Sequence, residues 1–444
     1  GSSPVFVLQH IFTHPQTATY NHVIVLNDAE EAAYFYNSIE SITGAMDLFY
    51  FPSSFKTSQN FNLLNPSHVM LRTEALTKLS MGGNKKIVVT YPEAFFEKVI
   101  MPKTLQENII QIKTNDTLGL NDLMERLVQY GFERTDFVYE PGQFALRGGI
   151  FDIYSFGNEK PYRVELFGEE VDSIRLFDPE TQLSERKLLQ VNIIPNVTTQ
   201  FEDTIKIPFM EFVPEHTVVW LKDWTLIQQR GNDQMEALEA FLLHAPILKI
   251  TDDADTHKKN TDKDDFVAVE KVIEQVFNKP IIEWGFQANL TKQKLAFSTQ
   301  VQPSFNRQFQ YLIANLQEYE KKGYDLFLFA EQAKQLERLH AIFTDLKTEI
   351  QFTPIVKNIH EGFIDHDHKM VCYTDHQIFQ RYHKYKVKQA YSKNKAITLR
   401  TLSDLHPGDY VTHIDHGVGV YSGLQKIEVN GMMQEAVRII YKDS

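Results

Sequence analysis

The sequence contains a single cysteine, Cys372, and lacks any apolar run close to the roughly 20 residues that cross a membrane. One thiol cannot form a disulfide within the chain, which excludes a disulfide-stapled secreted scaffold. Cys372 stands in the apolar segment 370–373, so we expect a small buried residue of a strand. These absences favour a protein of the reducing cytoplasm, without a signal peptide or membrane anchor.

The sequence also lacks the loop of the form GxxxxGK[ST] that binds nucleotide phosphates. The nearest segments, residues 42–46 and 82–86, do not have its spacing. No pair of acids follows an apolar strand to hold magnesium. We therefore expect no catalytic residue, no ATP hydrolysis, and no cofactor or metal bound by this chain.

Positive charge is scarce, since 45 Lys and Arg residues face 58 Asp and Glu residues, for a formal net charge of −13. A domain that grips duplex DNA usually has a basic face, because phosphate neutralisation drives that binding. This balance argues against DNA as the main ligand. Residues 381–400 carry basic residues without an acid and predict an exposed linker, with a nucleic-acid-binding segment as the alternative. The basic residues are Arg381, Lys384, Lys386, Lys388, Lys393, Lys395 and Arg400.

The chain has 444 residues. A single core stops growing at roughly 250–300 residues, so we expect about three to five domains. Residues 23–26, 48–52 and 87–90 are short apolar strands that alternate with helical segments. This alternation predicts a parallel sheet covered by helices on both faces. The same α/β style returns in the strand at residues 217–221 and again at residues 324–329.

Between residues 144 and 177 the apolar pattern changes to a period of two. Residues 143–147 predict a strand that continues into 150–154, with Gly148 and Gly149 as a bulge or bend. Residues 161–167 and 171–177 predict two more strands, so we expect an antiparallel meander in a small α+β domain.

Two polar stretches are predicted to lie in solvent. Residues 251–265 are dense in Asp, Lys and Asn, and predict a solvated loop. His360, His366 and His368 gather near Asp365 and Asp367, where a metal site is conceivable. The spacing fits no fixed ligand pattern, so a polar turn is favoured.

The segment 161–167 places Tyr162, Val164 and Leu166 on one side of a strand, as expected for a core face. Arg163, Glu165 and Phe167 share the other side. An exposed aromatic beside an arginine is typical of an interface hot spot. The alternative is that Phe167 ends the strand and tucks under the following turn. The residues alone do not decide between the two.

Two long motifs carry a family resemblance. Residues 142–154 and 161–178 closely resemble the module shared by UvrB and the transcription-repair coupling factors. Residues 405–419 resemble the start of the RNA-polymerase-interacting, CarD-like domain. The two motifs in this order favour the coupling factors over UvrB, and the resemblance covers nearly the whole chain.

The resemblance implies an α/β multidomain fold. It comprises a degenerate RecA-like, UvrB-like α/β domain with an inserted small α+β domain, a further α/β domain, and the start of a small Tudor/CarD-like β domain. The expected parts are domain 1a without a phosphate loop (1–110), the UvrA-binding UvrB-like domain 2 (111–195), domain 1b (196–298), a variable α/β domain 3 (299–380), a basic linker (381–404) and a partial RNA-polymerase-interacting domain (405–444).

The resemblance also implies a function. The family recognises RNA polymerase stalled at a lesion, displaces it by ATP-driven translocation on DNA, and recruits UvrA. Arg147, Arg163 and Phe167 match the family's UvrA-binding residues, and the completed C-terminal domain would bind the polymerase β subunit. ATP, magnesium and most contacts with DNA would belong to motor domains absent from this sequence. The alternatives are a UvrB-type helicase subunit and a nucleic-acid-binding module.

Overall fold

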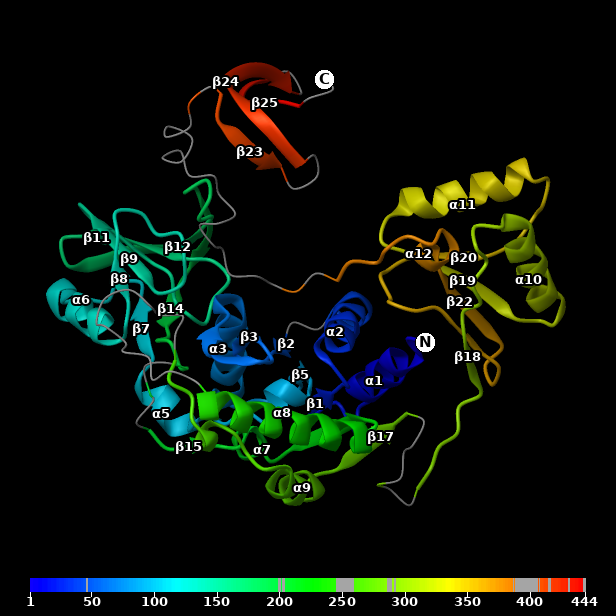
Figure 1. Ribbon diagram of the computed structural model, residues 1–444, viewed down its shortest axis with the longest axis horizontal. Helices are drawn as coiled ribbons and strands as arrows, with labels where there is room; N and C mark the ends of the chain where they lie inside the picture. Colours follow the sequence, from blue (N-terminus) through cyan, green and yellow to red (C-terminus); the bar gives the residue numbers. More distant parts are fainter. Residues whose placement is uncertain are drawn as a thin grey trace.

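The computed structural model describes residues 1–44, 47–198, 201, 204–244, 259–285, 290, 293–385, 387, 406, 408–413, 417–429 and 432–441. Several separate sheets follow one another along the chain (Figure 1). Among the described residues, no helix is long and apolar enough to cross a membrane. Most of the predicted basic linker lies outside the described residues, including Lys386, Lys388, Lys393, Lys395 and Arg400.

The first sheet has five strands, all paired in parallel. In spatial order they are β17 (Ile281–Trp284), β16 (Thr217–Lys222), β1 (Asn21–Val25), β5 (Ile87–Thr90) and β2 (Leu48–Phe51). Each of the three central strands contains a short apolar run and nearly every residue in them is buried, as a parallel sheet covered on both faces requires. The predicted parallel sheet is confirmed. It joins strands from residues 1–110 with strands from residues 196–298 into one body.

Helices and two small ribbons surround this sheet. The helices are α1 (Ser3–Thr13), α2 (Ala29–Thr43), α3 (Pro66–Ser80), α4 (Pro92–Phe95), α5 (Pro102–Glu107), α7 (Phe209–Phe212), α8 (Trp224–His244) and α9 (Val269–Phe277). The ribbons pair β3 (Phe55–Thr57) with β4 (Asn60–Leu64), and β6 (Val99–Ile100) with β15 (Lys206–Ile207). A single large apolar core runs through the sheet and most of these helices.

The second sheet has six strands and is inserted between β5 and β16 (Figure 1). Its order is β13 (Ser184–Leu188), β12 (Glu170–Phe177), β11 (Tyr162–Phe167), β10 (Ile150–Ile153), β9 (Gln143–Arg147) and β8 (Glu133–Arg134). The strands from β9 to β13 are antiparallel neighbours, which confirms the predicted meander. Helix α6 (Leu120–Gln129) packs on one face, and β7 (Ile110–Lys113) pairs with β14 (Gln190–Ile193).

The prediction for Gly148 and Gly149 was wrong. They do not bend one strand but form the two-residue turn of a hairpin, because Arg147 pairs with Ile150 across antiparallel strands. Gly148 has a φ of 58°, and a Cβ on Gly149 would lie 2.8 Å from the Leu166 carbonyl oxygen. Two glycines between alternating apolar segments are a hairpin signal, so the turn was readable from the sequence.

The third sheet contains β18 (Thr299–Val301), β21 (Phe363–Asp365), β22 (Met370–Thr374), β19 (Asp325–Ala330) and β20 (Thr353–Val356) in that order. Its helices are α10 (Phe309–Lys321), α11 (Ala333–Asp345) and α12 (Asp375–Ile378). Cys372 is buried in β22, as expected. This unit touches the first, since Phe6 of α1 packs edge-on against Phe329 and tilts against Phe363.

The last described strands form a three-stranded antiparallel sheet. They are β23 (Tyr410–His413), β24 (Gly417–Val429) and β25 (Met432–Ile440). A register shift between Tyr421 and Leu424 interrupts the long β24–β25 ladder, and Gly423 has a φ of 96° there. The β structure expected after residue 405 is therefore present as one bent antiparallel ribbon.

Candidate functional site

The face of the second sheet that points away from α6 gathers charged and aromatic side chains. We call it the outer face. Strand register places Asp152 of β10 opposite Arg163 of β11, which in turn lies opposite Arg175 of β12. The outer face is formed by Arg147, Asp152, Arg163, Glu165, Phe167, Ser173 and Arg175.

Phe167 lies at the end of β11, immediately before the turn at Gly168, and its exposed fraction is 84%. The β11–β12 register shifts between Glu165 and Leu166, just before the strand ends. A phenylalanine buried under its turn would be largely covered, so that alternative is wrong. A single exposed apolar side chain is common on protein surfaces. Phe167 is a candidate anchor because arginines lie on the same face of the sheet.

Arg163 is not exposed as the alternation of the strand predicted, because only 13% of its side chain is accessible. Its Nε and Nη2 atoms donate to the two carboxylate oxygens of Asp152 at 2.8 and 2.9 Å. Its Nη1 atom donates to the Gln182 carbonyl oxygen at 2.9 Å, and its guanidinium lies 4.4 Å from the Phe177 ring centroid. The hydrogen bond with Asp152 raises the pKa of Arg163. Arg163 is thus a covered, bidentate partner of a buried acid.

Arg147 approaches the same carboxylate from β9 and is 32% accessible. Its Nη2 atom donates to Asp152 at 2.6 Å, and its Nη1 atom donates to the Asp136 carbonyl oxygen at 2.6 Å. The guanidinium also lies 4.5 Å from the ring centroid of Phe137, which is half exposed. Arg147 therefore extends across the outer face, from the buried carboxylate of Asp152 to the half-exposed ring of Phe137.

Asp152 joins these side chains, and the sequence analysis missed it. Its side chain is fully buried and accepts hydrogen bonds from both arginines. An isolated buried carboxylate is strongly unfavourable, so two guanidinium partners are required to keep it charged. The available signal was an acid in the middle of the apolar strand Ile150–Ile153.

The segment that joins β1 to α2 in the first sheet is acidic, and it lies where nucleotide-binding folds bind phosphate. Only three residues separate β1 from α2. The Asp28 carboxylate caps α2 by accepting from the Glu31 amide at 2.8 Å, and the Glu31 carboxylate accepts from the Asn27 amide at 3.1 Å. Lys222 of β16 forms an ion pair with Glu31. Carboxylates of the chain itself thus satisfy amides at the helix N-terminus, where an anion would otherwise bind.

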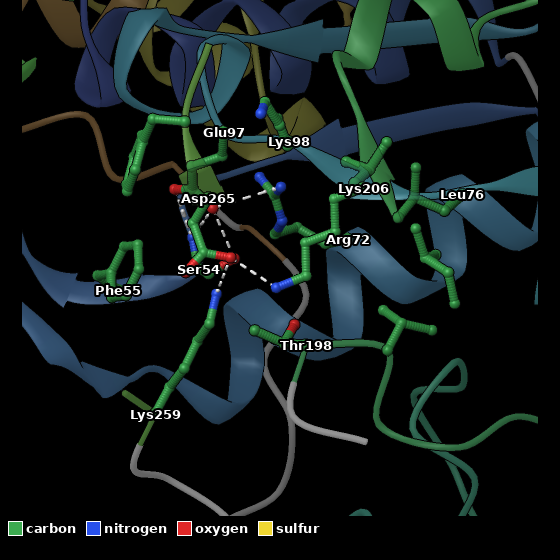
Figure 2. A pocket seen from close by; sticks show the side chains of 14 residues that line it. Ser54, Phe55, Arg72, Leu76, Glu97, Lys98, Thr198, Lys206, Lys259 and Asp265 are labelled. Carbon is green, nitrogen blue, oxygen red and sulfur yellow. Dashed lines mark hydrogen bonds and ion pairs between the residues drawn. The ribbon is translucent and has the colours of Figure 1, made fainter. Parts of the chain in front are cut away.

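A small cavity beside the same sheet is lined by a buried ionic network (Figure 2). Arg72 of α3 pairs with Glu97 at 3.3 Å, and both side chains are buried. The amide and hydroxyl of Ser54 donate to the same carboxylate. Burial lowers the pKa of Arg72, partly offset by Glu97. The cavity volume of about 30 Å³ admits only one or two water molecules, too small for a nucleotide.

The same cavity corrects the prediction of a solvated loop over residues 251–265. Residues 251–258 lie outside the described residues, but Lys259, Thr261 and Asp265 are buried. The Asp265 carboxylate accepts from Lys206 at 2.5 Å and pairs with Lys259 at 2.9 Å. Burial alone would raise the pKa of Asp265, but the two lysines outweigh it and lower that pKa. These charged residues were expected in solvent, but they are buried because their opposite charges neutralise one another.

The predicted histidine group divides in the structure. His366 contacts the Tyr324 hydroxyl at 2.9 Å, and the Nδ1 atom of His368 lies 3.0 Å from Asp365 in the β21–β22 turn. The predicted turn is confirmed there. His360 instead joins His376 and His383, which the sequence analysis missed because they follow it at distant positions.

Comparison with known proteins matches the outer face to a defined domain. The model of the UvrB interaction domain matches residues 110–198, and the model of the CarD-like/TRCF RID domain matches residues 405–444. The transcription-repair-coupling factor of Bacillus subtilis is 23% identical over 515 residues, spanning 100% of this chain and 42% of that protein. Over its whole length the chain resembles the transcription-repair-coupling factors.

Other transcription-repair-coupling factors match to a similar extent. The transcription-repair-coupling factor of Staphylococcus aureus strain Mu50 is 22% identical over 95% of this chain and 41% of its own length. That of Staphylococcus haemolyticus is 23% identical over the same two shares. The chain thus spans about two fifths of the length of these transcription-repair-coupling factors.

Proposed function

We propose that this chain recruits UvrA to RNA polymerase stalled at a DNA lesion, through the outer face of its second sheet. Phe167 is the observation that carries the proposal, since its ring stands in solvent within the segment matched by the UvrB interaction domain. An exposed aromatic next to arginines is the composition of an interface anchor. The relatives are named transcription-repair-coupling factors, and a surface that binds a repair protein fits that name.

The polymerase contact is proposed for residues 405–444, in the segment matched by the CarD-like/TRCF RID domain, with the β subunit as partner. ATP-driven translocation and most contacts with DNA are assigned to parts of the longer relatives that this chain does not span. The domain boundaries given above stay predictions.

Within the proposed UvrA site the three predicted residues have different roles. Phe167 is the direct anchor, because nothing covers most of its ring. Arg147 offers its accessible edge beside Phe137. Arg163 is a positioning residue, since Asp152 and the Gln182 carbonyl engage all three of its guanidinium nitrogens.

Phe167→Ala should weaken UvrA binding at least about thirtyfold, which corresponds to about 2 kcal/mol for a central anchor. The free energy of unfolding should change by less than about 0.5 kcal/mol, because the ring buries little surface. Titration calorimetry with UvrA and chemical denaturation measure the two quantities.

Val128→Ala is the matched control for this variant. Val128 is also an exposed apolar residue, 60% accessible, but it lies on α6, which covers the opposite face of the sheet. UvrA affinity should be unchanged. Equal losses in the two variants, or a large drop in melting temperature for Phe167→Ala, would contradict the outer face as the binding surface.

ATP with magnesium should give no saturable binding to this chain in a calorimetric titration. A phosphate at the start of α2 would have to displace Glu31 and approach the Asp28 carboxylate. Asp28→Asn and Glu31→Gln remove those charges, yet a link of three residues is too short to wrap a phosphate, so neither variant should bind. Saturable ATP binding by the unmodified chain that is lost in Lys222→Ala would support a UvrB-type subunit instead.

A further inference from the structure

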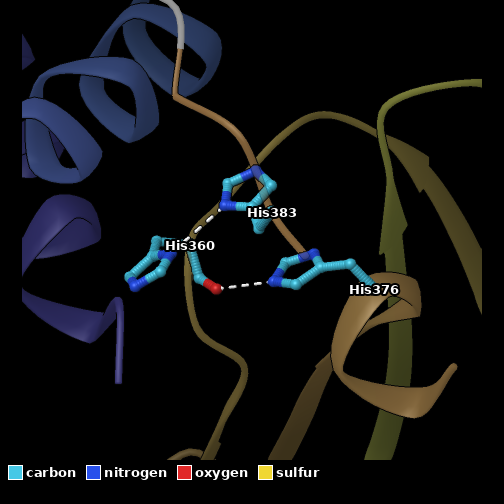
Figure 3. A group of neighbouring side chains, drawn as sticks. All are labelled: His360, His376 and His383. Carbon is cyan, nitrogen blue, oxygen red and sulfur yellow. Dashed lines mark hydrogen bonds between the residues drawn. The ribbon is translucent and has the colours of Figure 1, made fainter. Parts of the chain in front are cut away.

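Three histidines converge beside the first sheet, at the point where the chain leaves the third sheet. His360 precedes β21, His376 lies in α12, and His383 lies in the extended segment after it (Figure 3). One ring nitrogen from each lies within 4.8 Å of the other two. The Nδ1 atoms of His360 and His383 face each other at 3.1 Å.

Asn358, which lies outside the cluster, orients the ring of His383. The Nε2 atom of His383 contacts the Asn358 side-chain oxygen at 2.7 Å, which leaves its Nδ1 atom directed at His360. His376 differs, because its Nε2 atom contacts the His360 carbonyl oxygen within the cluster at 2.7 Å, and metal binding would replace this contact. A second-shell bond to the far nitrogen of an imidazole is a common feature of metal-binding histidines.

The surroundings are partly buried and join two units of the fold. Tyr34 of α2 stacks on His360 with ring centroids 3.6 Å apart, and its hydroxyl donates to the His383 carbonyl oxygen. Burial lowers the pKa of His360 to about 4 and that of His376 to about 3. Burial of these rings therefore disfavours the charged imidazolium form.

A purely structural cluster is the competing explanation. Stacked neutral rings pack well, and His376 lies nearly parallel to His383 with centroids 4.2 Å apart. However, packing alone does not require two ring nitrogens to face each other. In this arrangement the lone pair of one neutral ring must accept the single N–H proton of the other. Phenylalanine or tyrosine would fill the same space without that constraint.

We propose that His360, His376 and His383 bind one divalent transition-metal ion of the zinc class, which ties the segment after α12 to α12 and to the loop before β21. Three imidazoles with an open fourth position suit Zn²⁺ and its neighbours Co²⁺ and Ni²⁺. Ligand nitrogens of a tetrahedral zinc ion are about 3.3 Å apart, from Zn–N bonds of roughly 2.0–2.1 Å. The His360–His383 spacing of 3.1 Å is already close to this value. His376 completes the site by turning its ring away from the His360 carbonyl and out of the stack.

The test is a titration of the full chain, first stripped of metal with a chelator, with ZnCl₂ alone. One equivalent should bind and raise the melting temperature, and CoCl₂ should give the intense visible bands of a tetrahedral Co²⁺ ion. His383→Ala and His360→Gln should abolish both signals. Asn358→Ala should weaken the affinity by about 10–100-fold, since it removes the partner that orients His383.

His368→Ala provides the matched control, because His368 is an exposed histidine of the same unit outside the cluster. It should bind Zn²⁺ like the unmodified chain. The proposal is overturned if the unmodified chain binds no Zn²⁺, or if His360→Gln and His383→Ala, folded by circular dichroism, bind it with unchanged affinity. UvrA binding is measured separately, so either result leaves the proposed function untouched.

Discussion

Glu97→Gln should lower the free energy of unfolding by about 3–5 kcal/mol, the usual effect of removing one partner of a buried ion pair. The substitution leaves the guanidinium of Arg72 buried without a counter-charge, only 4% accessible beside the small cavity. Its bond to the Pro52 carbonyl oxygen at 2.9 Å remains, but a neutral acceptor does not replace a carboxylate. Chemical denaturation of the two proteins measures the difference.

Glu107→Gln is the control for this prediction. Glu107 pairs with Lys103 at 3.8 Å across one turn of α5, and both side chains are largely exposed. Breaking this pair should change stability by no more than about 0.5 kcal/mol. A comparable effect in the two variants would show that the Arg72–Glu97 pair is hydrated, against the burial described above.

Asp152→Asn should also destabilise the chain by about 3–5 kcal/mol, and it should weaken UvrA binding in addition. The amide is nearly the same size, but it offers one acceptor atom and no charge to two arginines that now share a carboxylate. Arg163 would be left partly covered without its counter-ion, and Arg147 would lose the bond that aims it along the outer face. Denaturation and calorimetry with UvrA report the two effects.

Glu165→Gln is the matched variant on the same face, in the neighbouring strand β11. Its partner Arg175 lies at 3.2 Å, and both side chains are about one third exposed. Stability should fall by less than about 1 kcal/mol because water screens this pair. If Asp152→Asn unfolds no more easily than Glu165→Gln, the pairing of Asp152 with two arginines is not what holds this face together.

Most strands of the first two sheets were predictable because their apolar periods are strong, whereas β8, β13 and β17 were not predicted. The apolar run at residues 87–90 gave β5 as predicted, and the alternation in Tyr162–Phe167 placed Tyr162 and Val164 in the core. The exposure of Phe167 was left open by the residues, and only the position of the β11–β12 turn decided it.

What could not be predicted depends on contacts between distant segments. Arg163 was expected in solvent because alternation gives the side of a strand, and a loop such as the one at Gln182 can still cover that side. Asp265 was expected in solvent because its lysines, Lys206 and Lys259, are brought to it only by the fold. The separation of His360 from His366 and His368 likewise follows from the packing of α2 against the third sheet.

The position of the inserted sheet has a consequence for synthesis on the ribosome. Asn21 of β1 pairs with Thr217 of β16, roughly 200 residues later, while β5 on its other side is available much earlier. At about 5–20 residues per second, β1 waits about 10–40 s for that neighbour, with one backbone edge unpaired. The inserted sheet, closed at its base by the β7–β14 pair, contains only local partners and can fold during the wait. The nascent chain would thus complete the inserted sheet, with its proposed UvrA site, before the sheet that carries it.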